Sequence, residues 1–369
     1  LSWMALLHTP TTPDAAGPVH SGLAEETGQD FEIQWVPDAS KEEKMNAALA
    51  SGSVADITSI TNLTNSSIRS GVTSGLFWDV EPFLGEFENL KGIDPKTIES
   101  ARLDGVLYGV PFQKPLARYG VLVRQDWLDE LGLDVPHTIE DLGEVAKAFA
   151  EGDPTGTGQS VTGFIDREES FKVGFRSLAG YFGAGETFQL DEAAGKIIPA
   201  CTSEAWMEAM EWYQEVYAAG GVNQEFITTQ KQNQQQAIAQ DKGGIVVTGL
   251  FEAKNYAALA DSINPDSGVE WTLINDITYA DVPRRIVSDT GGGMGGLFSI
   301  STQSVKSEDE VREVLAFADA LMTEEVHNLM TNGIEGTHYE VDGDGAVNII
   351  DEALWEQEVQ PYSSSRLAE

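Results

Sequence analysis

The sequence predicts an α/β protein with two domains. The chain has 369 residues, more than a single hydrophobic core usually organises. Hydrophobic residues make up 41% of it, which is typical of a globular rather than a disordered chain. Between residues 104 and 133 the pattern is strand, proline-marked crossing, strand and short capped helix. This order indicates a chain that leaves one α/β lobe and enters another.

The crossing starts at a tight turn. Asp104 and Gly105 favour that turn, because glycine accepts the positive φ that a hairpin needs. Val106–Val110 is predicted to be a short strand. Pro111 and Pro115 follow, and neither residue can sit in the central ladder of a sheet. We therefore expect the backbone to leave its first sheet here.

A second strand and a short helix complete the crossing. The strand is predicted at Tyr119–Val123, an apolar and β-rich run. Asp126 is expected to cap the helix and Gly132 to end it. Trp127 and Leu128 are expected to face inward, because they lie on the apolar side of this helix.

The stretch from Asp104 to Leu133 resembles the first inter-lobe crossing of extracellular solute-binding proteins, the ligand-capturing subunits of ABC importers. It is most similar to the sugar-binding group, family 1, which includes maltose-binding protein and the lipoprotein oligosaccharide binders. The pattern that carries the resemblance is Asp-Gly-x-Leu-Tyr-Gly-x-Pro, a hydrophobic strand, and Arg-x-Asp-Trp-Leu-Asp-x-Leu-Gly-Leu. Three further matches follow the family's order and extend it over nearly the whole chain: Leu49–Ile57, Asp153–Gly158 and Gly333–Tyr339.

The resemblance implies a two-lobed, periplasmic-binding-protein-like (Venus-flytrap) fold. Its lobes are discontinuous and joined by a multi-strand hinge. We expect residues 1–113 with 272–305 to form the N-terminal lobe, and residues 114–271 with 306–369 to form the C-terminal lobe. A ligand cleft is expected between the lobes. The implied function is to capture a carbohydrate, an oligosaccharide, by hinge closure and to deliver it to the permease subunits of an ABC transporter.

Before the crossing, apolar runs predict strands, and apolar residues three or four apart predict helices. In order, these are strand Trp3–Leu7, helix Val19–Thr27, strand Phe31–Val36, a helix that starts after Ser40, and the strand and exit loop Asp56–Asn62.

After the crossing, the same patterns continue. Up to the second crossing, they predict a helix from Thr138 to Ala150, a loop at Asp153–Gly158, a helix end and glycine-rich loop at Leu178–Gly185, a hairpin around Asp191–Ile198, helix Ser203–Ala219, a polar helix within Ile227–Lys242, strand Gly244–Thr248 and strand Val269–Leu273. The second crossing contains the glycine-rich run Ser288–Gly296. After it, they predict strand Leu297–Ile300, a helix opened by the capping box Ser307–Glu310, a hairpin at Asp342–Gly345, a short helix, and a mobile serine-rich tail.

Polar and aromatic residues at strand exits and crossings are the candidate ligand contacts, because ligands of open α/β sheets bind outside the carboxyl ends of the strands. The resemblance adds that sugars are held by polar side chains and by aromatic rings. The candidates are His8, Thr9, Thr61, Asn62, Gln113, Lys114, Arg118, Tyr181, Phe182, Phe251, Asp289 and Thr290. The three aromatic candidates are either ligand contacts or core residues. The three polar candidates beside the first crossing either contact the ligand or brace the hinge.

One further aromatic set is interpreted as structural. Trp206, Met210, Tyr213 and Tyr217 recur at helical spacing. This spacing favours a core stripe over a sugar platform.

No catalytic or metal-binding set is evident. The five histidines are scattered without zinc-ligand spacing, and no phosphate loop or nucleophile elbow occurs. Thr155 and Thr157 stand where a calcium loop would need anionic ligands, so we expect a solvated loop, no metal and no cofactor. A secreted glycoside hydrolase with paired carboxylates is the alternative, because sequence alone does not place the 60 carboxylates.

Charge and cysteine content bound the partners. With 22 basic and 60 acidic residues the net charge is −38, which argues against nucleic acid as a partner. The single cysteine, Cys201, is expected to be a small buried residue. Leu1–Leu7 lacks the basic region of a signal peptide. The resemblance implies a secretion signal and a lipid-attached cysteine upstream, an extracellular or periplasmic location, and a monomer.

Overall fold

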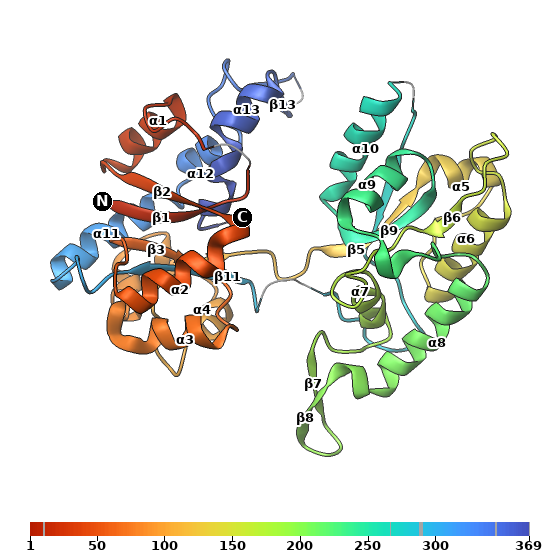
Figure 1. Ribbon diagram of the computed structural model, residues 1–369, viewed down its shortest axis with the longest axis horizontal. Helices are drawn as coiled ribbons and strands as arrows, with labels where there is room; N and C mark the ends of the chain where they lie inside the picture. Colours follow the sequence, from red (N-terminus) through yellow and green to blue (C-terminus); the bar gives the residue numbers. More distant parts are fainter. Residues whose placement is uncertain (10–11, 266, 288–290, 344, 369) are drawn as a thin grey trace. The chain divides into compact units, whose positions relative to one another are not determined.

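The structure of this chain is a computed structural model that describes residues 1–9, 12–265, 267–287, 291–343 and 345–368. It divides into two compact units. Unit 1 contains Leu1–Leu116 and Thr290–Glu369, and unit 2 contains Ala117–Asp289. In Figure 1, unit 2 is one continuous run of colour from yellow through green into blue-green, whereas unit 1 combines red and orange segments with blue ones. Both units mix helices and strands, which confirms the predicted α/β class.

Unit 1 is built on a five-stranded sheet with the order β2-β1-β3-β11-β4. Its strands are β1 (Ser2–Leu7), β2 (Glu32–Pro37), β3 (Ile57–Ile60), β4 (Val110–Gln113) and β11 (Met294–Ile300). β1 runs parallel to β2 and β3, whereas β11 runs antiparallel to β3 and β4. The carboxyl ends of β1 to β4 therefore share one edge of the sheet with the start of β11.

Helices and a small ribbon complete unit 1. The helices are α1 (Pro18–Thr27), α2 (Lys41–Ser51), α3 (Ser66–Gly71), α4 (Pro95–Ala101), α11 (Glu308–Ala320), α12 (Glu324–Thr331) and α13 (Glu352–Glu358), and the ribbon is β12 (Tyr339–Val341) with β13 (Val347–Ile349). In Figure 1, α1 lies beside α12, and α2 lies beside α3. The predicted capping box at the start of α11 is confirmed, since Ser307 and Glu310 satisfy each other's backbone N–H groups.

The core of unit 1 joins segments that are far apart in the sequence. The Trp3 ring on β1 lies 5.4 Å from that of Phe298 on β11 and 6.0 Å from that of Phe317 on α11, centroid to centroid. The indole Nε1 of Trp3 donates a hydrogen bond of 2.9 Å to the hydroxyl of Ser59 on β3. Aromatic contacts of this kind add to the free energy gained from burial alone.

Unit 2 is built on a four-stranded sheet with the order β10-β5-β9-β6. Its strands are β5 (Tyr119–Arg124), β6 (Thr162–Phe164), β9 (Gly243–Gly249) and β10 (Trp271–Ile274), and a separate hairpin consists of β7 (Phe188–Asp191) and β8 (Lys196–Pro199). β9 runs parallel to β6 and antiparallel to β5. Every residue of β9 is buried, as expected for a central strand covered on both faces.

The helices of unit 2 follow the predicted order except for α10, which the sequence patterns did not predict. They are α5 (Gln125–Leu131), α6 (Ile139–Glu151), α7 (Gly174–Tyr181), α8 (Glu204–Ala218), α9 (Lys231–Ala239) and α10 (Glu252–Ile263). The side chain of Thr138 caps α6, and Gly132 ends α5 in the left-handed conformation. Trp127 and Leu128 are buried as predicted.

The observed division of the chain differs from the predicted lobes. Residues 306–369 belong to unit 1 rather than to the second lobe, and residues 272–289 belong to unit 2. The first difference arises because α11 carries Val311, Leu315 and Phe317 into the same core as Trp3. The second arises because β10 pairs with β5 along its whole length.

The strand before the first crossing also lies later than predicted. Val106 forms only an isolated bridge to Leu103, and β4 begins at Val110 and includes Pro111. The prediction was wrong because it excluded proline from the strand altogether. β4 lies at the edge of the sheet, where a missing N–H breaks no ladder. Asp104 and Gly105 adopt the positive φ expected of the turn, at 53° and 88°.

Three local predictions are wrong. Asp126 does not cap α5, because its carboxylate pairs instead with the guanidinium of Arg124 at 2.5 Å. Cys201 is exposed, because its neighbour in a short 3₁₀ turn occupies the buried position. The serine-rich segment near the carboxyl end is packed, since Tyr362 and Leu367 are buried in the core of unit 1.

Candidate functional site

The carboxyl edge of the unit 1 sheet brings together candidates from three strands. His8 and Thr9 follow β1, Thr61 follows β3, and Lys114 follows β4. The register Gln113↔Met294 places the start of β11 at the same edge. The predicted candidates of unit 1 therefore gather along one edge although they lie up to 106 positions apart in the sequence (8 to 114).

His8 is held at this edge by a neighbouring carboxylate. Its Nδ1 lies 3.3 Å from Oδ1 of Asp38, which also pairs with Nζ of Lys41 at 2.7 Å. Burial lowers the pKa of His8, and Lys41 and Lys114 lower it further against the opposing effect of Asp38. His8 is thus neutral at pH 7 and can exchange hydrogen bonds with hydroxyl groups.

Asn62 is fixed in an exposed turn after β3. Its φ is 56°, a left-handed conformation that asparagine tolerates better than most residues. Its amide oxygen accepts a hydrogen bond of 2.9 Å from the hydroxyl of Thr64, and its amide nitrogen donates to the carboxylate of Glu42. Thr61 precedes it and lines a small depression beside Met45. The turn therefore presents a preorganised polar surface.

Gln113 and Lys114 have different surroundings at the end of β4. The backbone N–H and side-chain amide of Gln113 both donate to the carbonyl of Leu367, at 2.9 and 3.4 Å. Gln113 therefore braces the carboxyl-terminal segment. The aliphatic stem of Lys114 covers Gly295, where an added Cβ would meet Lys114 Cγ at 2.8 Å. Lys114 itself is half-buried.

The corresponding edge of unit 2 contains the pair Arg118 and Phe251. β5 starts where β9 ends, with the register Tyr119↔Gly249, and the amide of Leu250 donates a 3.0 Å hydrogen bond to the carbonyl of Arg118. The guanidinium carbon of Arg118 lies 5.4 Å from the centroid of the Phe251 ring. The exposed fraction of Phe251 is 56%. Of the three aromatic candidates, Phe251 is the one that presents its ring to solvent.

Gly249 permits this placement of Phe251. A Cβ at position 249 would lie 2.3 Å from the phenyl ring, well inside contact distance. The ring therefore folds back over a backbone that has no side chain. Glycine is required here for close approach and not for an unusual φ.

For two of the aromatic candidates the structure favours the core alternative. The exposed fractions of Tyr181 and Phe182 are 2% and 3%, so both are core residues at the end of α7. The Phe182 ring lies 4.3 Å from that of Tyr279, and burial raises the pKa of the Tyr181 phenol. The other pair of candidates, Asp289 and Thr290, lies outside the described residues.

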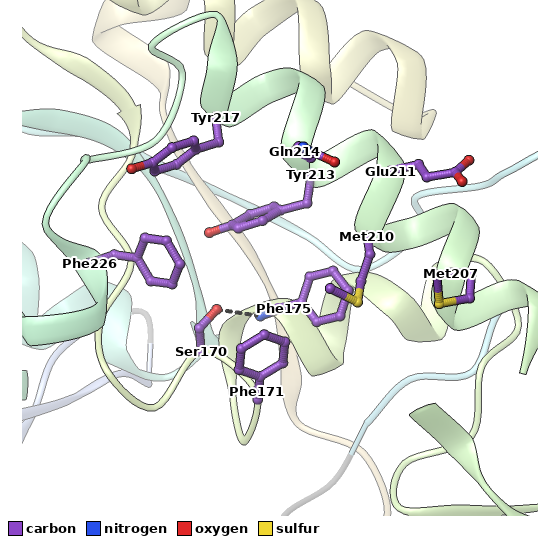
Figure 2. A pocket seen from close by; sticks show the side chains of 10 residues that line it. All are labelled: Ser170, Phe171, Phe175, Met207, Met210, Glu211, Tyr213, Gln214, Tyr217 and Phe226. Carbon is purple, nitrogen blue, oxygen red and sulfur yellow. Dashed lines mark hydrogen bonds between the residues drawn. The ribbon is translucent and has the colours of Figure 1, made fainter. Parts of the chain in front are cut away.

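A pocket of about 540 Å³ lies within unit 2 beside α8 (Figure 2). Its lining residues are Ser170, Phe171, Phe175, Met207, Met210, Glu211, Tyr213, Gln214, Tyr217 and Phe226. The predicted core stripe on α8 is therefore correct only in part. Trp206 and Tyr213 are buried, but Met210 is 39% exposed, and it lines the pocket together with Tyr217.

A metal ion would need a cluster of ligand side chains among the described residues. No group of three or more histidine, cysteine, aspartate or glutamate side chains there could hold a metal ion. In the loop after α6, the Asp153 carboxylate accepts hydrogen bonds from the backbone of Thr157 at 3.1 Å and of Gly158 at 2.8 Å, and from the hydroxyl of Thr155 at 3.0 Å. Within the same part of the chain, no helix combines the length and apolar character needed to span a bilayer.

The comparisons with known proteins agree on one family. Residues 23–334 match the family model described as bacterial extracellular solute-binding protein. The chain is 34% identical over 367 residues to the polygalacturonan/rhamnogalacturonan-binding protein YtcQ of Bacillus subtilis (strain 168), covering 99% of this chain and 72% of that protein. It is 31% identical over 345 residues to lipoprotein LipO of the same organism, covering 92% and 67%.

A solved structure supports the fold. The extracellular solute-binding protein of Bifidobacterium longum subsp. infantis matches with a TM-score of 0.75 at 19% identity, covering 100% of this chain and 76% of that chain. At this level of identity the likeness concerns the fold alone.

Proposed function

Because the chain belongs to the bacterial extracellular solute-binding protein family, we propose that it captures an oligosaccharide outside the cytoplasm for import by an ABC transporter. The observation that carries the sugar assignment is the exposed ring of Phe251 beneath the guanidinium of Arg118. Such a ring offers an apolar face to the C–H groups of a sugar, and the neighbouring cation offers hydrogen bonds to its hydroxyls.

The polar edge of unit 1 supports the same proposal. His8, Thr61, Asn62 and Lys114 supply hydrogen-bonding groups of both kinds, donors and acceptors. In the proposal, each unit provides part of the ligand contacts. A ligand then favours whichever arrangement lets both sets of contacts form at once, which is capture by population shift.

Two basic residues near the first crossing bear on the class of sugar. Lys114 and Arg118 are four positions apart in a chain whose net charge is −38. A relative with 34% identity is named for binding polygalacturonan and rhamnogalacturonan, which contain uronic acid. Acidic oligosaccharides therefore belong in the test beside neutral ones, although the overall acidity of the chain opposes long-range attraction of anions.

Thermal unfolding with a panel of oligogalacturonides and neutral oligosaccharides tests the proposal. A ligand at 100 times its Kd adds about 2.7 kcal/mol to the free energy of unfolding, which raises Tm by several degrees. The proposal predicts stabilisation by one class of oligosaccharide and no shortened products after prolonged incubation. Stabilisation by none of the sugars would reject the sugar assignment, and accumulation of cleaved products would favour a glycoside hydrolase.

Permease subunits, a lipid anchor and a monomeric state belong to the same proposal. Family membership supports the permease subunits, and the lipoprotein relative supports the lipid anchor. Small-angle scattering in the presence of the stabilising sugar would test ligand capture and oligomeric state together. We expect a monomer-sized particle whose radius of gyration falls when the ligand is added.

A further inference from the structure

The pocket beside α8 has a chemistry of its own. Its walls are five aromatic rings and two thioether side chains (Figure 2). Phe171, at 56% exposure, and Met207, at 50%, remain open to solvent, whereas Phe175 and Tyr213 form a buried floor. The Phe171 and Phe175 rings meet edge to face at 5.4 Å, and Phe175 meets Tyr213 at 5.5 Å. This cluster holds the walls of the pocket in place without a ligand.

The hydroxyl groups of the lining residues are already used within the protein. Ser170 and Tyr213 both donate to the carboxylate of Asp166, the latter at 2.5 Å, and Ser170 accepts a 3.4 Å bond from the backbone of Phe175. Tyr217 donates to the carbonyl of Gln224 at 3.1 Å. The floor and walls therefore present carbon and sulfur to an occupant.

Polar groups stand at the exposed side instead. Glu211 and Gln214 lie on the solvent-facing side of α8 and line the pocket. A sugar ring has an apolar C–H face and an edge that carries hydroxyl groups. The aromatic wall can pack against the C–H face, while the amide and the carboxylate at its margin can hydrogen-bond with the hydroxyls. A purely apolar occupant would form no hydrogen bond with either group.

The charge of the pocket lining disfavours anionic sugars. None of the ten lining residues is lysine or arginine. The helix α8 that forms one wall carries Glu204, Glu208, Glu211 and Glu215, and no basic residue. A uronate carboxylate here would find no cation among the lining residues and would face the acidic side chains of α8, so its lost hydration would be poorly compensated.

We propose that this pocket binds one uncharged sugar ring, best a 6-deoxyhexose, as a separate subsite for the neutral part of a mixed glycan. A methyl group in place of the hydroxymethyl group suits walls that offer no free hydroxyl partner. This inference rests on the proposed function, in that a glycan receptor is assumed. In this proposal there are two sites. The site at Arg118 and Phe251 binds acidic or neutral sugars, and the pocket beside α8 binds neutral sugars only.

Methionine methyl NMR tests the proposal directly. Of the seven methionines, Met207 and Met210 line the pocket and the other five belong to unit 1. The full chain is labelled with ¹³C-methyl methionine and titrated with methyl α-L-rhamnopyranoside, and in parallel with methyl α-D-galactopyranosiduronate. We expect the Met207 and Met210 signals to shift and saturate with the rhamnoside and to stay unchanged with the uronate.

A matched pair of variants gives the control. Phe171→Ala removes a wall of the pocket, and Phe188→Ala removes a ring of similar exposure, 63%, from the hairpin outside it. We expect the first variant to weaken rhamnoside binding about tenfold and the second to leave it unchanged. Both rings are largely exposed, so both variants should fold.

The outcomes separate this inference from the proposed function. Absence of shifts at Met207 and Met210, equal shifts with both sugars, or equal weakening by the two variants would overturn the pocket assignment. Oligosaccharide stabilisation that depends on Phe251 would still support the proposed function in that case. Methyl shifts without any oligosaccharide stabilisation would support the pocket and reject the main site.

Discussion

Phe251→Ala gives the sharpest test of the main site, because the structure separates its effect on folding from its effect on binding. The exposed fraction of Phe251 is 56%, so folding buries less than half of the ring. Full burial of such a side chain contributes roughly 1.5–3 kcal/mol, so the loss here is about 1 kcal/mol. The contact with Arg118 adds about 0.5–1 kcal/mol at an exposed site. The expected decrease in the free energy of unfolding is about 2 kcal/mol.

The same substitution should also weaken ligand binding strongly. An aromatic ring that anchors a ligand is typically worth about 2 kcal/mol or more, or roughly 30-fold in Kd. Isothermal titration calorimetry of the stabilising oligosaccharide measures that change, and urea unfolding measures the change in stability. Phe188→Ala is the control, since it removes an exposed ring from the same unit at a site away from Arg118.

An unchanged Kd in Phe251→Ala would refute the reasoning. So would an equal loss of affinity in Phe188→Ala, because the loss would then reflect general damage to unit 2. Arg118→Ala alone and the double variant complete a cycle. A coupling energy near zero would show that the two side chains act independently.

Three further predictions follow from the structure. Arg124→Met should lower the free energy of unfolding by about 2 kcal/mol in urea titrations, because Arg124 is only 3% exposed and pairs with two carboxylates. The loss is no larger because Asp126 and Asp241 keep some access to water; an unchanged urea midpoint would contradict this. His8 should titrate in NMR below its usual pKa of 6.5, so its contribution to stability is present above pH 6.5 and is lost as the pH falls toward its folded pKa; His8→Ala should remove that part of the pH dependence. EDTA and added Ca²⁺ should both leave Tm unchanged, because Asp153 is occupied by its own loop; a rise in Tm with Ca²⁺ would show that the loop binds metal.

Sequence patterns predicted most of the local structure. β5, α5, α6 and the capping box of α11 lie within a few residues of their predicted positions. These elements have strong local signals: an apolar run, or a capping residue followed by apolar spacing. Phe251 was predicted to be either an exposed ligand contact or a core residue. In the structure its ring is exposed, because it lies in the loop that follows β9.

The failures concern information that is not local. Tyr181 and Phe182 stand at the end of α7, a position that ligand-binding residues can also occupy, and only packing against β9 and Tyr279 identifies them as core. The pocket beside α8 was missed because Phe171 and Phe226 come from loops 55 positions apart (171 to 226). In the sequence, the two methionines Met207 and Met210, three positions apart on one helix, were its one signal.

The position of β11 in the sheet has a consequence for biosynthesis. β11 lies between β3 and β4, yet 180 residues separate the end of β4 from the start of β11 (114 to 293). While the chain emerges from the ribosome, β4 has no partner until all of unit 2 has been translated. Unit 2 is contiguous and can fold first, whereas the earlier segments wait with unpaired edges that are open to aggregation. A chaperone that holds this nascent intermediate would therefore act on the amino-terminal third of the protein.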